Sequence, residues 1–161
     1  MSDTSDPAPS PFDAYKRAKE RTQEKPSGDA TTIRDLKGDG GEGALLHIKT
    51  TATLREACEF LSERRIGLVL VCDAEGSLAG VLSERDVVRA IAEHGSDALR
   101  AACANFITRD VFTCTSTDLV VDVARTMSAR RFRHLPIVDD GTLAGMVSAT
   151  DIVDFFANQQ N

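Results

Sequence analysis

The chain contains the same pattern twice. Residues 66–73 read Ile-Gly-Leu-Val-Leu-Val-Cys-Asp, and residues 132–139 read Phe-Arg-His-Leu-Pro-Ile-Val-Asp. A second apolar run follows each, at 78–86 and 143–151, and ends in Ser-x-x-Asp before an apolar helical stretch. A repeat constrains the fold more than any single motif, because both copies must form the same structural unit. We therefore expect pseudo-twofold symmetry, with two related clefts where the halves meet.

The first copy predicts the element order β-α-β-β-α. A strand over residues 44–49 precedes Thr53 and Glu56, whose spacing is that of a capping box at a helix start. Continuous apolar runs at 67–72 and 78–82 are typical of strands covered on both faces. Two helices carry apolar residues at helical spacing: Leu54, Ala57, Cys58 and Leu61, then Val87, Val88, Ala90 and Ile91.

The second copy repeats this order, with strands expected over 111–115, 134–138 and 143–147. Its helices carry Val120, Val123, Ala124 and Met127, then Ile152, Val153, Phe155 and Phe156. The repeat distance falls from 66 to 65 residues between these helices because the turn at 139–141 is one residue shorter. A length change confined to a turn is typical of a true repeat. The predicted fold class is α/β (α+β), built from tandem β-α-β-β-α units.

The domain organisation follows from the repeat and from composition. The start of the chain is rich in Pro, Ser, Asp and Lys, which is typical of a disordered segment. Ser96 is the expected N-cap of a helix at 97–105 that links the copies. The expected organisation is a disordered tail at 1–30, a first repeat at 31–95 opening with apolar residues at 33–36, a connecting helix at 96–106, and a second repeat at 107–157.

Charge and cysteine content exclude several classes of function. The net charge is −6, and an acidic chain lacks the basic surface that general nucleic-acid binding needs. No apolar run approaches the roughly 18 residues of a membrane span, and the start is no secretory signal, so we expect a cytoplasmic protein. No C-x-x-C pair occurs, so we expect reduced thiols and no metal site. The four cysteines are Cys58, Cys72, Cys103 and Cys114.

The two units resemble a tandem pair of CBS domains, named after cystathionine β-synthase and often called a Bateman module. The resemblance covers residues 31–157, and stretches 80–90 and 108–114 look particularly like small stand-alone bacterial members. It implies a regulatory module without catalysis. Such modules bind AMP, ADP, ATP or S-adenosylmethionine, less often NAD, in the clefts between repeats, and commonly pair into flat dimers.

Ser83 and Asp86, with Ser148 and Asp151, are the first candidate binding residues. The resemblance implies that each Asp accepts hydrogen bonds from the ribose hydroxyls, with the Ser near ribose or phosphate. An ionised carboxylate only accepts hydrogen bonds, which suits a vicinal diol, and a helix start attracts an anion. The same Ser-x-x-Asp is also a plain capping box. Both interpretations stay open.

Arg133 and His134 are the second candidates, because the resemblance places the position three before Pro136 near the ligand phosphate. Arg donates two parallel hydrogen bonds to a phosphate, and His changes charge near neutrality. Alternatively, Arg133 pairs with Asp139 or Glu84, and His134 is an ordinary strand-edge residue.

The first copy lacks this basic group, since Gly67 and Leu68 stand at the equivalent positions. The two clefts are therefore expected to be chemically unequal. Thr108, just before the second copy, is a further candidate for the cleft that contains Ser83 and Asp86.

No catalytic constellation is present, because a nucleophile needs a base and an orienting group within reach. We therefore expect no enzyme and no cofactor. The expected protein is a regulatory sensor of adenine nucleotides that acts as a homodimer on an unidentified partner protein. The alternatives are a ligand-free dimerisation scaffold and a binder of NAD or S-adenosylmethionine.

Overall fold

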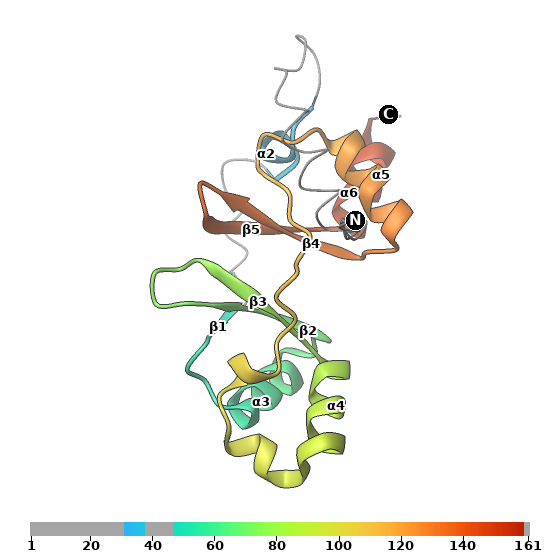
Figure 1. Cartoon of the computed structure of the whole chain (residues 1–161). Helices are drawn as coiled ribbons and strands as arrows, with labels where there is room; N and C mark the ends of the chain where they lie inside the picture. The colour runs from blue at the N-terminus through green and yellow to red at the C-terminus, as the bar shows by residue number, and fades with distance from the viewer. Residues whose placement is uncertain (1–30, 38–46, 160–161) are drawn as a thin grey trace, which may run out of the picture. The chain divides into compact units, whose positions relative to one another are not determined.

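Two β-hairpins, each followed by a helix, organise the computed structural model (Figure 1). The structure describes residues 31–37 and 47–159. The predicted tail at 1–30, the glycine-rich stretch at 38–43 and the first residues of the strand expected at 44–49 lie outside these ranges.

The first repeat is a three-stranded sheet with two helices. Strand β1 (His47–Lys49) pairs in parallel with β2 (Leu68–Cys72), and β2 pairs antiparallel with β3 (Leu78–Ser83). Helices α3 (Leu54–Arg64) and α4 (Glu84–His94) lie on the same face of this sheet (Figure 1). The predicted β-α-β-β-α order is confirmed for this repeat.

Helix α3 begins and ends as its sequence dictates. The Thr53 amide donates to Glu56 Oε2 at 2.7 Å, and the Glu56 amide donates to Thr53 Oγ1 at 3.2 Å, so the predicted capping box is present. Arg65 ends the helix in a left-handed conformation with φ 53°. The buried side chains of α3 are Leu54, Ala57 and Leu61.

The α-helix expected over 97–105 is absent, and that prediction was wrong. Two short 3₁₀ helices stand there instead, η1 (Gly95–Arg100) and η2 (Cys103–Asn105). The residue that precedes η1 is His94, which makes no side-chain cap, so Ser96 is not an N-cap.

Backbone pairing with the start of α3 explains the interruption. The Leu54 amide donates to the Ala101 carbonyl at 2.9 Å, and the Cys103 amide donates to the Ala52 carbonyl at 2.8 Å. These bonds hold the chain extended at Ala101, where ψ is 157°. A tertiary contact therefore overrides the local helical preference of this alanine-rich segment.

The second repeat is a two-stranded antiparallel sheet with its own helices. Strands β4 (His134–Asp139) and β5 (Thr142–Ser148) form the hairpin, and helices α5 (Val120–Arg130) and α6 (Ala149–Asn158) complete the unit. The buried side chains of α5 are Val120, Val123 and Met127, at the predicted spacing.

The strand expected over 111–115 reduces to a single bridge, so that prediction was wrong. Cys114 pairs in parallel with Ile137, and the neighbouring residues form no ladder. The Thr115 amide donates instead to Asp118 Oδ2 at 2.8 Å. This side-chain bond closes a turn directly after Cys114, so the chain leaves β4 after one bridge.

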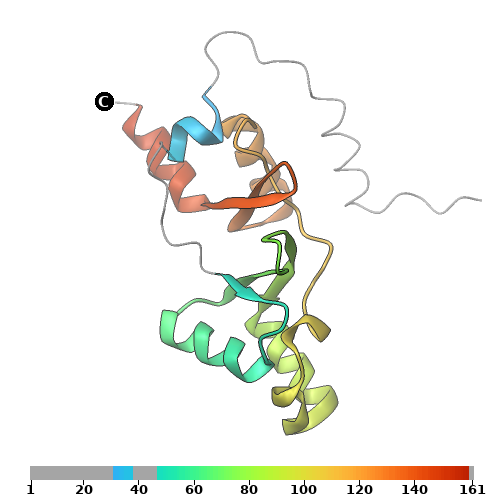
Figure 2. The same cartoon turned by 90° about the vertical axis from the view of Figure 1, so that its left-hand side faces the viewer.

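The apolar segment at 33–36 lies against the domain, as expected, but it packs on the second repeat. It forms helix α2 (Ile33–Lys37), whose Ile33 is fully buried in the core that contains α5 and β4. The Ile33 amide donates to the Asp118 carbonyl at 2.9 Å, and the Val120 amide donates to the Thr31 carbonyl at 3.1 Å. Figure 2 shows α2 beside α6. The first helix described in the chain thus completes the core of the last repeat.

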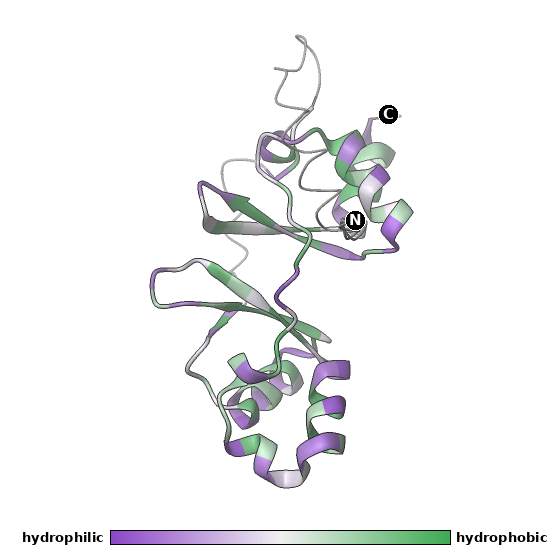
Figure 3. Cartoon of the chain, in the orientation of Figure 1, coloured by the Kyte–Doolittle hydropathy of each residue, from purple (hydrophilic) through white to green (hydrophobic). Residues whose placement is uncertain are grey.

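Helices α4 and α6 bury only part of their apolar residues. Ala90 and Ile152 are buried, whereas Val88 is 68% exposed and Val153 is 64% exposed. Ile91 and Phe156 are also exposed. In Figure 3, hydrophobic residues alternate with hydrophilic ones along both helices. These four exposed residues occupy equivalent positions in the two repeats.

Within the described residues, no helix combines the length and the hydropathy that crossing a membrane requires.

Candidate functional site

The first junction, Ser83 to Asp86, is where β3 passes into α4. Asp86 Oδ2 accepts hydrogen bonds from the Ser83 amide at 2.8 Å and from Ser83 Oγ at 2.7 Å. In return, the Asp86 amide donates to Ser83 Oγ at 3.3 Å. Arg89 Nη1 lies 3.7 Å from Asp86 Oδ1. The carboxylate is therefore enclosed, and Asp86 is only 7% exposed.

The second junction, Ser148 to Asp151, repeats this frame where β5 passes into α6. The Ser148 amide donates to Asp151 Oδ2 at 2.8 Å, and the Asp151 amide donates to Ser148 Oγ at 3.1 Å. The backbone angles of the two serines agree within 1°. The capping-box interpretation of both Ser-x-x-Asp motifs is thus confirmed, and their binding role remains a prediction.

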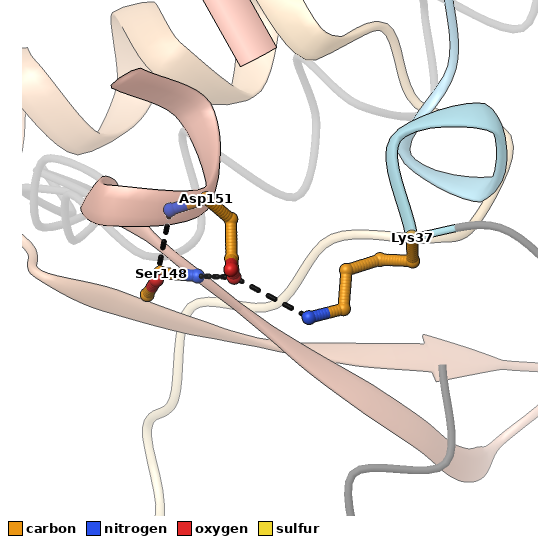
Figure 4. Close-up of polar contacts among 3 residues, drawn as sticks. All are labelled: Lys37, Ser148 and Asp151. Carbon is orange, nitrogen blue, oxygen red and sulfur yellow. Dashed lines mark hydrogen bonds and ion pairs between the residues drawn. The ribbon is translucent and has the colours of Figure 1, made fainter. Parts of the chain in front are cut away.

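Asp151 has a partner from the other end of the chain. Lys37 Nζ, at the end of α2, lies 3.3 Å from Asp151 Oδ2 (Figure 4). Partial burial, the largest single influence, raises the Asp151 pKa, but the hydrogen bonds from Ser148 and the charge of Lys37 outweigh it. The net effect lowers the Asp151 pKa below its ordinary value.

The two carboxylates differ in access and in the source of their counter-charge. The Asp86 side chain is 8% exposed and its cation, Arg89, comes from one turn further along the same helix. The Asp151 side chain is 34% exposed. The residue equivalent to Arg89 is Asp154, an acid, and the cation comes from Lys37 instead. Asp151 is therefore the more accessible acceptor.

The structure brings Arg133 and His134 close to the second junction. His134 is the residue of β4 that pairs with Ser148, and the Arg133 carbonyl accepts a hydrogen bond from the Ala149 amide at 2.9 Å. Both side chains are exposed. Their predicted contact with a phosphate remains a prediction.

The equivalent place in the first repeat is acidic. The Glu84 amide donates to the Gly67 carbonyl at 3.0 Å, and a Cβ added to Gly67 would lie 3.4 Å from Glu84 Oε2. Glu84 therefore lies where the second repeat has Ala149, and Gly67 lies where it has Arg133. The predicted chemical inequality of the two repeats extends to their charge.

Thr108 lies against the first repeat, as its candidate role requires. Its amide donates to the Val81 carbonyl at 2.8 Å, and the Val81 amide donates back to the Thr108 carbonyl at 2.9 Å. This places Thr108 across from β3, two residues before Ser83. A Cβ at Gly80 would lie 2.4 Å from the Thr108 carbonyl oxygen, so only glycine permits this approach.

Two cations near the carboxylates were not identified from the sequence. Arg89 stands three residues after Asp86 on a helix, a spacing that indicates contact and was available as a signal. Lys37 is separated from Asp151 by 114 residues, so no local pattern links them.

Among residues 31–37 and 47–159, no group of three or more His, Cys, Asp or Glu side chains is placed to hold a metal ion.

These features define a duplicated α/β fold in which a Ser-x-x-Asp capping box stands at the start of the last helix of each repeat. Comparison with protein families agrees with this class. The CBS domain matches residues 44–93 and 103–158. The chain belongs to the CBS-domain family and contains a pair of these domains, so it is a CBS-domain regulatory module.

Three similar proteins illustrate the match. An uncharacterised protein of Methanocaldococcus jannaschii, MJ1225, is 33% identical over 112 residues, which are 70% of this chain and 39% of the relative. The crystal structure of the CBS-domain protein ATU1752 from Agrobacterium tumefaciens has a TM-score of 0.63 at 32% identity, covering 80% of this chain and 95% of that one. The crystal structure of CBSX2 in complex with AMP has a TM-score of 0.69 at 23% identity, covering 81% and 98%.

The chain spans well under half the length of its archaeal relative. The relatives come from both archaea and bacteria, so the resemblance to bacterial members does not extend to the origin of this chain.

Proposed function

We propose that this chain binds an adenine nucleotide at its two junctions and that binding changes its interaction with a partner protein. The duplicated carboxylate at a helix start supports this proposal most directly. At each junction a serine amide fixes one carboxylate oxygen. At the second junction Ser148 and Lys37 both contact Oδ2, which leaves Asp151 Oδ1 to accept ribose hydroxyls, whereas Asp86 Oδ1 faces Arg89 at 3.7 Å. The AMP complex of CBSX2, a protein of the same fold, supports adenine nucleotides as the ligand class.

The second junction is the better candidate for tight binding. Asp151 is more exposed than Asp86, and Arg133 and His134 stand beside Ser148 as exposed donors for a phosphate. Glu84 gives the first junction the opposite charge, which disfavours a phosphate there.

Calorimetric titration with AMP, ATP, NAD and S-adenosylmethionine tests the proposal. We expect an adenine nucleotide to bind, and we expect Asp151→Ala to weaken binding by about 1–3 kcal/mol through lost hydrogen bonds to a charged group. Asp97→Ala removes the same charge from an exposed position on η1, away from both junctions, and is the matched control. No binding of any of the four compounds at about millimolar concentration would exclude nucleotide sensing.

The exposed apolar residues of α4 and α6 support a homodimer. Val88 and Ile91 form a stripe at i, i+3 on α4, and Val153 with Phe156 form its equivalent on α6. Duplicated apolar stripes of this kind suit burial against a second copy of the chain. If the nucleotide titrations fail, this surface favours the second candidate function, a ligand-free dimerisation scaffold.

Sedimentation velocity tests the dimer. The double variant Val88→Asp/Val153→Asp places a carboxylate in each apolar stripe. It is expected to shift the chain from dimer to monomer, because burying an unpaired charge in the interface is costly. Ala74→Asp adds the same group to the exposed β2–β3 turn and is expected to leave the dimer intact. A wild-type chain that sediments as a monomer at all concentrations would exclude this assembly.

The proposed location is the cytoplasm, and we propose no enzymatic activity. The four cysteines, all within the described residues, form no disulfide, and burial raises the pKa of the Cys58, Cys72 and Cys103 thiols, which makes them unreactive. Free thiols suit a reducing compartment. Hydrolysis of ATP by the purified chain, abolished by Ser148→Ala, would contradict the absence of catalysis.

A further inference from the structure

The two junctions obtain their positive charge in different ways, and this difference has a functional consequence. On α4, Arg89 stands one turn after Asp86, so the counter-charge is part of the same helix. On α6, the equivalent residue is Asp154, and two acids one turn apart leave the start of this helix with a double negative charge. These two acids weaken the attraction that Arg133 offers to the phosphate of a nucleotide, and a further cation would strengthen it.

Helix α2 brings that cation. It is anchored by Ile33, which is fully buried, and by Arg34, whose Nη2 donates to Ser116 Oγ at 2.8 Å. The Thr32 amide also donates to Asp35 Oδ2 at 2.8 Å and closes the start of the helix. Lys37 follows these anchors directly, so its ammonium is placed at Asp151 by the docking of α2 on the second repeat.

We propose that Lys37 is a ligand-binding residue of the second junction, which selects for anionic ligands and couples their binding to the docking of α2. An ammonium group has three donors, and the bond to Asp151 uses one of them. The Lys37 side chain is 29% exposed, so it is not closed off from solvent. A nucleotide gains from this charge, whereas a neutral nucleoside does not.

The coupling works in both directions. If docked α2 strengthens the binding of an anionic ligand, the ligand must strengthen the docking of α2 by the same factor. The amide of Val120, which donates to the Thr31 carbonyl, reports this docking through its hydrogen exchange. The inference rests on the proposed nucleotide binding. It adds that the ligand must carry a negative charge and that its binding changes the docking of helix α2.

The test is an NMR titration of the full chain with AMP and, separately, with adenosine. The Asp151 amide reports the second junction, and the Asp86 amide reports the first junction in the same sample. We expect Lys37→Met to weaken AMP binding at Asp151 by about three- to tenfold and adenosine binding by less than about twofold. The effect on AMP is expected to shrink between about 0.05 and 0.5 M NaCl.

Matched variants separate the charge from structural damage. Lys49→Met removes the same charge from an exposed strand residue and is expected to change neither affinity. Lys37→Arg keeps the charge and is expected to restore AMP binding. Slow exchange of the Val120 amide in Lys37→Met without ligand is expected to show that α2 stays docked. In the wild type, AMP is expected to slow the exchange of the Val120 amide further. In Lys37→Met, AMP is expected to slow it much less.

Each result supports or overturns the inference. Unchanged or tighter AMP binding in Lys37→Met, with wild-type binding intact, overturns the role of Lys37 and leaves the proposed function standing. Equal losses for AMP and adenosine also overturn it, because they contradict charge selection. A wild-type chain that binds neither compound removes the proposed function and this inference together.

Discussion

The Ser83–Asp86 and Ser148–Asp151 junctions have the same backbone and different surroundings. Both serines cap a helix with nearly identical backbone angles, and both aspartates accept a hydrogen bond from the serine amide. The Asp86 side chain is 8% exposed and its nearest cation, Arg89, belongs to the same helix. The Asp151 side chain is 34% exposed and forms an ion pair with Lys37, which comes from a distant segment. Duplication has therefore preserved the hydrogen bonds that form the helix start, while charge and access have diverged.

The largest expected difference between the repeats concerns their glycines. Gly80→Ala is expected to cost about 3 kcal/mol of unfolding free energy, because the new Cβ would overlap the Thr108 carbonyl, which belongs to the backbone. Gly145→Ala is expected to cost less than about 1 kcal/mol, since its Cβ would lie 3.3 Å from the movable Ile137 Cδ1. Urea denaturation measures both. Equal losses would show that the Thr108 approach is not rigid.

A smaller difference is expected between the two carboxylates. Asp86→Ala removes a buried carboxylate, leaves the part-buried Ser83 amide and hydroxyl without their acceptor, and is expected to cost about 2 kcal/mol of unfolding free energy. Asp151→Ala exposes the Ser148 amide to water and is expected to cost about 1 kcal/mol, the usual loss of a cap. A larger loss for Asp151→Ala in the same denaturation series would contradict the difference in enclosure.

Acid should affect the second junction through Asp151. Burial raises the Asp151 pKa, but Ser148 and Lys37 lower it by more, so the folded pKa lies below 3.8, its ordinary value. A lowered folded pKa stabilises the fold above that ordinary value, and the stabilisation is lost as pH falls through the folded pKa.

The measurement is the difference in unfolding free energy between the wild type and Asp151→Asn, which cannot titrate. We expect a constant difference near neutral pH that shrinks under acid, and a smaller difference when Lys37→Met is present in both chains. A difference that grows as pH falls would mean that the Asp151 pKa is raised in the folded state.

The smallest expected effect belongs to Arg89. Its side chain is 60% exposed and lies 3.7 Å from Asp86, so Arg89→Met is expected to change the unfolding free energy by less than about 0.5 kcal/mol. Thermal unfolding at low and high salt measures this. A loss that matches that of Asp86→Ala would show that Arg89, and not Ser83, holds the first carboxylate.

Elements with local causes were predictable from the sequence. The capping boxes at Thr53, Ser83 and Ser148 need only residues three positions apart, and the structure shows all three. The hairpins follow from apolar runs and turn residues, which are local as well.

The errors lie where distant partners decide the structure. Residues 97–105 lose a regular helix to backbone bonds with the start of α3, and residues 111–115 keep only the bridge between Cys114 and Ile137. Lys37 was missed for the same reason, since only the folded chain brings it to Asp151. The spacing of a repeat predicts the helices and strands that both copies form. It does not predict that α2, which has no counterpart in the repeat pattern, brings Lys37 to the second copy alone.

The position of α2 has a consequence for how the chain is made. Arg34 bonds to Ser116, a residue 82 positions later, and Ile33 fills the core of the repeat that a ribosome would synthesise last. This helix has no completed docking surface until that repeat has emerged, so its attachment is a late event in folding. A fragment that begins after the first repeat would carry a hole where Ile33 belongs, and adding α2 as a separate peptide is the way to fill it.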